Sequence, residues 1–241
     1  MRGFGFRRVF RRGFPLGVYR YLRERLLQPY VHFLLRRASR ARGSAFTVVQ
    51  IGANDGIHTD PISSLVRELG WAGVLVEPNP HNFLLLQEHY RAFPQIKLEN
   101  AAIAAEDGTV QLYRPKELLD GSHNPLKGKD SLHPESFSKY SWMAENWADL
   151  VEPIEVPALC LDSLFEKYSL REIHFFVCDT EGHDKVILDQ LDLSRFAPSF
   201  IQFEFVHLGS QEVATLVQRL RSHGYRVLYL RWDIFAYHTK A

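Results

Sequence analysis

The chain has 241 residues, of which 46% are hydrophobic and 24% are charged, a composition typical of an ordinary soluble globular protein. This length fits one large α/β domain with an appendage, or two small domains. The two cysteines, Cys160 and Cys178, are too few for a structural zinc site, and we expect two free thiols in a reducing compartment. No run of about 18 apolar residues occurs, so we predict no transmembrane helix.

The first 43 residues differ in charge from the rest of the chain. They hold twelve arginines and one acidic residue, Glu24, whereas the remainder is net acidic. Apolar residues at helical spacing predict a helix over 17–41, which Pro29 kinks or divides. Arginines interleaved with aromatic residues fit three roles: docking on an anionic membrane surface or a protein partner, nonspecific nucleic-acid binding, or a solvated extension packed on the acidic domain. We predict a cytoplasmic protein, with peripheral association at the inner face of the membrane as one option.

From residue 45 onwards the pattern predicts strands that alternate with helices. An apolar run over 46–51 reads as a buried parallel strand, and the next helix begins with Asp60 as N-cap and Pro61 as its first residue. Asn79 and Pro80 open a second helix. Further strands are predicted at 73–76, 96–102 and 109–113.

Residues 114–152 interrupt this alternation. The stretch is rich in glycine and proline and carries His123, His133, Tyr140, Trp142 and Trp147. A loop of this length inside a compact domain is usually functional or disordered. We therefore predict a lid or substrate-recognition insertion.

Beyond the insertion the alternation resumes. Strands are predicted at 154–156, 173–178, 200–205, 225–230 and 233–237, and helices at 161–168, after residue 183 and at 210–223. Alternation from 46 to 223 implies an α/β fold with a parallel sheet and helices on both faces. Ligands of such a sheet bind beyond the C-terminal ends of its strands.

Two neighbouring strand ends carry the features of a nucleoside site. Gly52 and Gly56 form a turn whose backbone N–H groups can approach a ligand, and Glu77 can accept two hydrogen bonds from a ribose diol. The spacing Gly-x-x-x-Gly differs from the Gly-x-Gly-x-x-Gly turn that cradles a pyrophosphate. We therefore expect S-adenosylmethionine (SAM), which carries no phosphate. The structural alternatives are tight packing at the glycines and an exposed strand end at Glu77.

Residues 179–184 place four titratable groups within six positions. Carboxylates this dense need a cation, hydrogen bonds or solvent, and helix capping accounts for one or two of them. The others can orient or deprotonate a substrate hydroxyl. Alternatively, Asp179 and Glu204, from adjacent strand ends, share a divalent cation such as Mg²⁺. His183 is a candidate base, or a hydrogen-bonding loop residue.

Five motifs in register resemble the FkbM-type SAM-dependent methyltransferases. They span about residues 46–206 and occupy 50–56, 76–80, 100–102, 161–164 and 179–184. The resemblance implies the class I methyltransferase fold, which is α/β and Rossmann-like with a mostly parallel seven-stranded sheet. It also implies SAM as methyl donor and O-methylation of a hydroxyl, often on a sugar or natural product.

The resemblance also implies roles for single residues. Gly52, Asn54 and Gly56 would lie near the methionyl part of SAM, and Glu77 would hold its ribose. The predicted cofactor-binding set is completed by Gln50, Asn100 and Ala102. Asp179 and Glu181 would face the transfer site, with His183 as the third catalytic candidate. The family often has Glu where this chain has Asp184, and neither the insertion nor the arginine-rich segment belongs to the resemblance.

We therefore predict a SAM-dependent O-methyltransferase of a saccharide, with an arginine-rich helical extension at 1–44 and the methyltransferase domain at 45–241. A different reading is a non-catalytic module that binds SAM or a nucleoside and docks a membrane-associated glycan-assembly complex. Methylation of nucleic-acid bases is disfavoured, because the chain lacks both an Asn/Asp-Pro-Pro-aromatic turn and a Pro-Cys nucleophile after the fourth strand.

Overall fold

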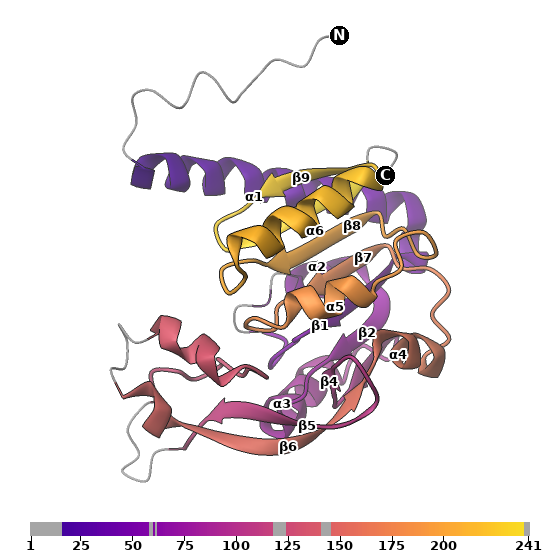
Figure 1. The fold of residues 1–241 in the computed structure, drawn as a ribbon. Coiled ribbons are helices and arrows are strands. Elements are labelled where there is room, and N and C mark those ends of the chain that lie inside the picture. The colour runs from indigo at the N-terminus through magenta and orange to yellow at the C-terminus, as the bar shows by residue number, and fades with distance from the viewer. Residues whose placement is uncertain (1–15, 58–59, 61, 118–123, 141–145, 239–241) are drawn as a thin grey trace.

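The computed structural model describes residues 16–57, 60, 62–117, 124–140 and 146–238, and its centre is a seven-stranded sheet (Figure 1). Its strands lie in the order β3 (Ile96–Glu99), β2 (Ala72–Val76), β1 (Thr47–Ile51), β7 (Phe175–Cys178), β8 (Phe200–Glu204), β10 (Asp233–His238) and β9 (Tyr225–Tyr229). Strand β10 is antiparallel to both of its neighbours, and the other neighbouring pairs are parallel. The predicted mostly parallel α/β sheet is confirmed.

The central strands are buried along almost their whole length. Every residue of β7 and β8 is buried, as is every residue of β1 and β2 except the first. A strand covered on both sides needs apolar side chains on both of its faces, which explains the apolar runs that predicted these strands. Three polar exceptions are buried in these strands: Gln50 near the C-terminal end of β1, and Gln202 and Glu204 in the second half of β8.

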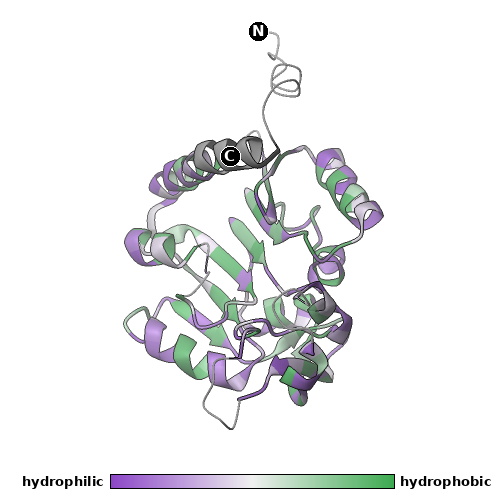
Figure 2. Ribbon diagram, turned by 90° about the vertical axis from the view of Figure 1, so that its left-hand side faces the viewer, coloured by the Kyte–Doolittle hydropathy of each residue, from purple (hydrophilic) through white to green (hydrophobic). Residues whose placement is uncertain are grey.

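Helices cover both faces of the sheet, and Figure 2 shows the apolar strands between them. One core contains side chains of α2 (Ser63–Leu69), α3 (Pro80–Tyr90) and the second half of α1 (Leu16–Arg42). The other contains side chains of α4 (Leu161–Lys167), α5 (Asp184–Gln190) and α6 (Ser210–Ser222). Val48 belongs to the first core and Val49 to the second, as the alternation of side chains along a strand requires.

A smaller sheet lies beside the main one, in the order β4 (Ala102–Ile103), β6 (Val151–Leu159) and β5 (Gly108–Pro115). The predicted strand over 96–102 is wrong at its end, because β3 stops at Glu99 and the chain then joins this second sheet as β4. The described part of the insertion forms 3₁₀ helices at Pro134–Tyr140 and Trp147–Leu150, around a small core of Leu126, Phe137 and Val151. His123 and Trp142 lie outside the described residues.

Helix α1 is continuous through Pro29, which does not divide it as the sequence suggested. Val31, Leu35 and Ala38 are buried in the core that contains α2, and Trp71 Nε1 donates a hydrogen bond to Ser39 Oγ at 2.6 Å. This packing crosses the boundary predicted at residues 44 and 45, so the second half of α1 is part of the folded core. Within the described ranges, no helix combines the length and the apolar character needed to span a bilayer.

Replacing Leu35 by alanine is expected to lower the free energy of unfolding by about 2–4 kcal/mol, because Leu35 is 1% exposed and its removal leaves a cavity between α1 and the sheet. Denaturant titration followed by circular dichroism measures this loss. Phe33→Ala on the same helix is the matched control, since Phe33 is 57% exposed and its loss should cost less than about 0.5 kcal/mol. Equal losses in the two variants would mean that α1 is not packed on the domain in solution.

Candidate active site

A cavity of about 280 Å³ opens at the C-terminal ends of β1, β2, β7 and β8. Strand β1 lies between β2 and β7, so the order of the strands reverses there, and ligands of open parallel sheets bind at such a switch point. Residues 128–132 of the insertion also line the cavity. Of the residues predicted for the site, the cavity is lined by Gln50, Gly52, Asn54, Glu77, Ala102, Asp179, Glu181, His183 and Glu204.

The glycine turn after β1 is held tightly against the neighbouring strands. The backbone N–H groups of Gly52 and Ala53 both donate to the carbonyl of Val76 at 3.0 Å. Gly52 has a φ of 81°, and a Cβ at this position would lie 1.9 Å from the carbonyl oxygen of Asp179. Gly56 does not line the cavity, and a Cβ there would lie 2.6 Å from Leu86 Cδ1 on α3. Close contact with the end of β7 thus requires a glycine at position 52, and packing on α3 requires one at position 56. Gly52 also lines the cavity, so its predicted contact with a cofactor stays a prediction.

Glu77 lies at the end of β2 with its carboxylate fixed by the backbone. Its Oε2 accepts a hydrogen bond from Asn54 N–H and its Oε1 from Asn79 N–H, both at 2.8 Å. The side chain lines the cavity, and the residue is only 4% exposed. Burial and the nearby Asp130 raise the pKa of Glu77 to about 8, against the effect of the two N–H donors. Each carboxylate oxygen retains a second lone pair for a ligand hydroxyl.

Asp130 from the insertion lies beside Glu77 and was not predicted. Its Oδ1 and Oδ2 accept hydrogen bonds from Asn79 Nδ2 and Asn82 Nδ2, each at 2.9 Å, at the beginning of α3. Burial raises the pKa of Asp130 to about 6. Two amide side chains spaced by three residues at a helix start were the only local signal, and they do not identify their partner.

The remaining cofactor candidates divide into two groups. Gln50, Asn54 and Ala102 line the cavity, and Gln50 Oε1 is buried with no hydrogen-bond partner in the described chain. Asn100 is not among the lining residues. Its Nδ2 donates to the carbonyls of Glu77 at 2.7 Å and Pro78 at 3.1 Å, so it shapes the loop that carries Glu77.

Two of the carboxylates in residues 179–184 line the cavity, and the third is used internally. Asp184 Oδ2 accepts a hydrogen bond from Thr180 Oγ1 at 2.8 Å, and its Oδ1 accepts one from the backbone N–H of Glu204 at 3.2 Å. Asp184 therefore ties the end of β7 to β8. Burial and the carboxyl groups of Glu181 and Asp184 raise the pKa of Asp179 well above its ordinary value.

Glu181 is surrounded by donors, two of which come from the insertion. Its Oε1 accepts from Lys129 Nζ at 2.7 Å, and its Oε2 accepts from Tyr140 Oη at 2.5 Å and lies 2.9 Å from His207 Nε2. Burial alone would raise the pKa of Glu181, but hydrogen bonding to His207 and the charge of Lys129 bring this pKa below its ordinary value. The sequence pattern gave no signal for these three donors at this place.

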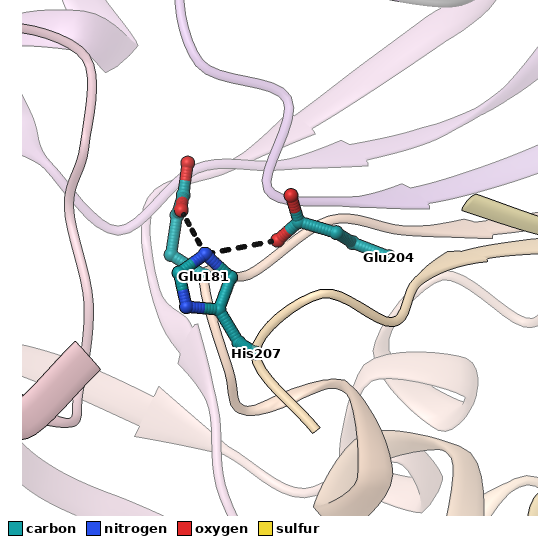
Figure 3. Close-up of side chains that lie close together, drawn as sticks. All are labelled: Glu181, Glu204 and His207. Atoms are coloured by element: carbon teal, nitrogen blue, oxygen red, sulfur yellow. Dashed lines mark ion pairs between the residues drawn. The ribbon is translucent and has the colours of Figure 1, made fainter. Parts of the chain in front are cut away.

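His207 also brings Glu181 and Glu204 together (Figure 3). Its Nε2 is 3.6 Å from Glu204 Oε2. Each of the three residues has one potential metal-ligand atom, and these three atoms all lie within 4.8 Å of one another. Asp179, which the sequence paired with Glu204 for a metal, is not a member of this group. Burial, Asp179 and Glu181 raise the pKa of Glu204 to about 10.

His183 presents an imidazole to the same cavity. Its Nδ1 is 2.9 Å from Nε2 of His133 in the insertion. Its Nε2 is buried and, counting only described residues, has no hydrogen-bond partner. Burial and the nearby His133 lower the pKa of His183 to about 4, so the ring is neutral near pH 7.

The sheet order, the cavity at its switch point and the strand-end carboxylate place this chain among proteins with the class I methyltransferase fold. The family model described as the methyltransferase FkbM domain matches residues 50–227. The chain belongs to the FkbM methyltransferase family, and the methyltransferase predicted from the sequence is confirmed at this level.

Two of the solved structures that are similar to this chain are methyltransferases. The crystal structure of methyltransferase FkbM from Methylobacillus flagellatus KT is 13% identical, with a TM-score of 0.50 over 80% of this chain and 43% of that one. The METTL16 MTase domain is also 13% identical, with a TM-score of 0.48 over 86% of this chain and 66% of that one. The chain thus covers less than half the length of the first protein. No curated protein matches the sequence.

Proposed function

We propose that this methyltransferase uses SAM and transfers its methyl group to a hydroxyl group of a saccharide. The observation that carries the proposal is Glu77, a buried carboxylate fixed by two backbone N–H donors beside the glycine turn. A carboxylate at the end of the second strand suits the two hydroxyls of a ribose.

The cavity residues fit SAM better than a phosphate-bearing cofactor. Among the described residues, those that line the cavity include seven acidic residues and one lysine, Lys129. The carboxyl groups can accept hydrogen bonds from the ribose hydroxyls of SAM, whereas one lysine supplies too few cationic partners for a pyrophosphate. Gln50 Oε1, buried and without a partner in the described ranges, is a further acceptor for the cofactor. When bound, SAM supplies a methyl group activated by the positive sulfonium.

The chain's own contribution to the transfer is placement of the acceptor and removal of its proton. His183 carries this role in our proposal, because the residue lines the cavity and its buried Nε2 has no partner among the described residues. A turn of the ring towards the cavity would let the neutral Nε2 accept the hydrogen bond and then the proton of an acceptor hydroxyl. Asp179 and Glu181, the other predicted catalytic residues, line the same cavity and surround the acceptor.

Two features of the cavity support a saccharide as acceptor. The lining offers many hydrogen-bonding carboxyl groups but only one lysine, which suits a neutral polyhydroxyl compound better than a phosphate-bearing acceptor such as nucleic acid. Trp232 lines the cavity and is 45% exposed, so it offers a flat apolar surface for a sugar ring. Glycans and sugar-bearing natural products both meet these requirements.

Docking through the N-terminal segment is part of the same proposal. In the second half of α1, Arg37, Arg40 and Arg42 are exposed, as is the ring of Phe33. Cationic and aromatic groups together suit an anionic membrane surface or an acidic protein partner. A cytoplasmic enzyme held at the inner face of the membrane would then meet lipid-linked saccharides.

The functional test offers saccharides and glycans to the full chain with methyl-labelled SAM. We expect label on an acceptor hydroxyl, located by mass spectrometry. His183→Ala should still bind SAM, measured by calorimetry, but should lose the transfer. SAM binding without transfer to any acceptor would instead support the non-catalytic module, and absence of SAM binding would contradict both readings.

The affinity of the cavity for 5′-methylthioadenosine, a nucleoside without the amino-acid part of SAM, is expected to rise about thirtyfold from about pH 6.5 to about pH 9. The pKa of Glu77 is about 8, so its carboxyl group is mostly protonated at about pH 6.5 and mostly ionised at about pH 9. Only the ionised form can accept hydrogen bonds from both ribose hydroxyls. Calorimetric titration at several pH values measures the effect. Glu77→Gln should abolish the pH dependence, and a rise that persists in this variant would assign it to another group.

A further inference from the structure

Three potential metal ligands converge on one side of the cavity. Glu181 lies in the loop after β7, Glu204 is the last residue of β8, and His207 follows three residues later. Glu181 and Glu204 are each 8% exposed, and the side chain of His207 is 3% exposed. Figure 3 shows the imidazole between the two carboxyl groups, with Nε2 directed towards both.

The spacing of these atoms suits a small divalent cation. His207 Nε2 lies 2.9 Å from Glu181 Oε2 and 3.6 Å from Glu204 Oε2. Ligands about 2.1 Å from a common cation are separated by about 3.0 Å at a right angle and by about 3.4 Å at the tetrahedral angle. Small side-chain rotations would therefore bring all three atoms into a first coordination sphere.

A buried oxygen of Glu204 without a hydrogen-bond donor is a second, independent indication that a ligand binds at this cluster. The residue is more than nine-tenths buried, and its Oε2, directed at His207 Nε2, accepts no hydrogen bond from any described residue. A buried carboxyl oxygen without a donor is costly, and such atoms in native proteins usually meet a ligand, an ion or water. A cation at the centre of the three residues would contact this oxygen.

The surrounding charges leave room for a cation. Asp179 and Asp184 lie close enough to Glu204 to disfavour its ionisation, whereas Lys129 favours it. Lys129 contacts Oε1 of Glu181, so Oε2 faces His207 and Tyr140. A divalent ion would favour the ionised form of Glu204 that the neighbouring carboxyl groups disfavour, while Lys129 kept its contact with Glu181.

We propose that Glu181, Glu204 and His207 bind a divalent first-row transition-metal ion such as Mn²⁺ or Zn²⁺. An imidazole with two carboxylates suits these ions, whereas Mg²⁺ and Ca²⁺ prefer oxygen ligands alone. The proposed site thus differs from the sequence-based hypothesis, in which Asp179 and Glu204 share a Mg²⁺ ion. Three protein ligands leave coordination positions open towards the cavity, where an acceptor hydroxyl can bind. That use rests on the proposed methyl transfer, whereas the binding itself does not.

Direct metal binding tests the site without any acceptor. The full chain is freed of metal with a chelator and titrated with Mn²⁺ and Zn²⁺ by calorimetry, and we expect one ion per chain. Loss of one of three ligands in His207→Ala or Glu204→Gln should weaken the affinity at least about a hundredfold. His133→Ala, which removes an imidazole that is not among the three proposed ligands, should leave the affinity unchanged within about twofold. Circular dichroism confirms that each variant is folded.

Spectroscopy on the unmodified chain covers the case in which a variant fails to fold. Pulsed electron paramagnetic resonance of bound Mn²⁺ should show coupling to one histidine nitrogen. Any of three results would overturn the proposal. The unmodified protein could bind neither ion at about 1 mM, or bound Mn²⁺ could show no nitrogen coupling. Metal binding could also be lost in His133→Ala but kept in His207→Ala. A parallel SAM titration keeps the two proposals apart, since metal binding without SAM binding would contradict only the proposed function.

Discussion

Glu77→Ala is expected to weaken SAM binding about a hundredfold or more. A hydrogen bond to a charged group contributes about 1.5–3 kcal/mol, and the variant removes the acceptor of both ribose hydroxyls. It also leaves the N–H groups of Asn54 and Asn79 without their carboxylate, which loosens the turn that lines the cavity. Isothermal titration of the full chain with SAM measures the loss, and thermal melting shows whether the variant is folded.

A buried carboxylate on the next strand provides the control. Glu99, at the end of β3, contacts Tyr168 and Lys167 and does not line the cavity, so Glu99→Gln should bind SAM within about twofold of the unmodified chain. The SAM affinity of Glu77→Gln should lie between those of Glu77→Ala and Glu99→Gln, because the amide oxygen of glutamine still accepts a hydrogen bond but its NH₂ group cannot. If Glu77→Ala bound SAM with the affinity of the unmodified chain, Glu77 would not be the residue that holds the ribose.

The parts of the fold that could be predicted are those that local patterns determine. Buried parallel strands need continuous apolar runs, and such runs located β1, β7 and β8 to within a few residues. Glu77 could be predicted as well, because a single carboxylate directly after an apolar run must lie at the C-terminal edge of the sheet. The structure adds its backbone partners, which no pattern in the sequence indicates.

The sequence predicted a lid or recognition role for the insertion, and residues 128–132 do line the cavity, but the contacts of the insertion could not be assigned. Lys129 contacts Glu181 across 52 positions and Tyr140 contacts it across 41. Such contacts depend on how the loop folds over the sheet, and no periodicity in the loop encodes that path. His207 was not predicted because Glu204, three residues before it, gives no specific signal alone, and the second carboxylate, Glu181, comes from the loop after β7.

Motif residues also proved to have different physical roles. Asn100 and Glu77 both lie in segments that resemble the family, but only Glu77 opens onto the cavity, while Asn100 holds the loop that carries it. Similarly, Gly56 accommodates Leu86 of α3 and does not contact the cavity. A resemblance identifies positions that matter for the site, and the geometry decides which of them can touch a ligand.

Gly52→Ala is expected to lower the free energy of unfolding by about 4 kcal/mol or more. A left-handed backbone costs an alanine about 1–2 kcal/mol, and Gly52 has a φ of 81°. The larger cost is steric, because the new Cβ would lie 1.9 Å from the carbonyl oxygen of Asp179 and must push the ends of β1 and β7 apart. That movement would break the hydrogen bond from Asp179 N–H to the carbonyl of Ile51 and open the floor of the cavity.

Gly70→Ala separates the backbone cost from the steric one. Gly70 ends α2 with a φ of 65°, and no atom of the described chain lies within 4 Å of a Cβ built there. This variant should therefore lose only about 1 kcal/mol in the same denaturant titration, with its SAM affinity unchanged. If the two alanine variants lost equal stability, backbone strain alone would explain both, and the tight contact between β1 and β7 would not exist in solution. The difference between them thus measures how closely these two strands approach beside the glycine turn that lines the cavity.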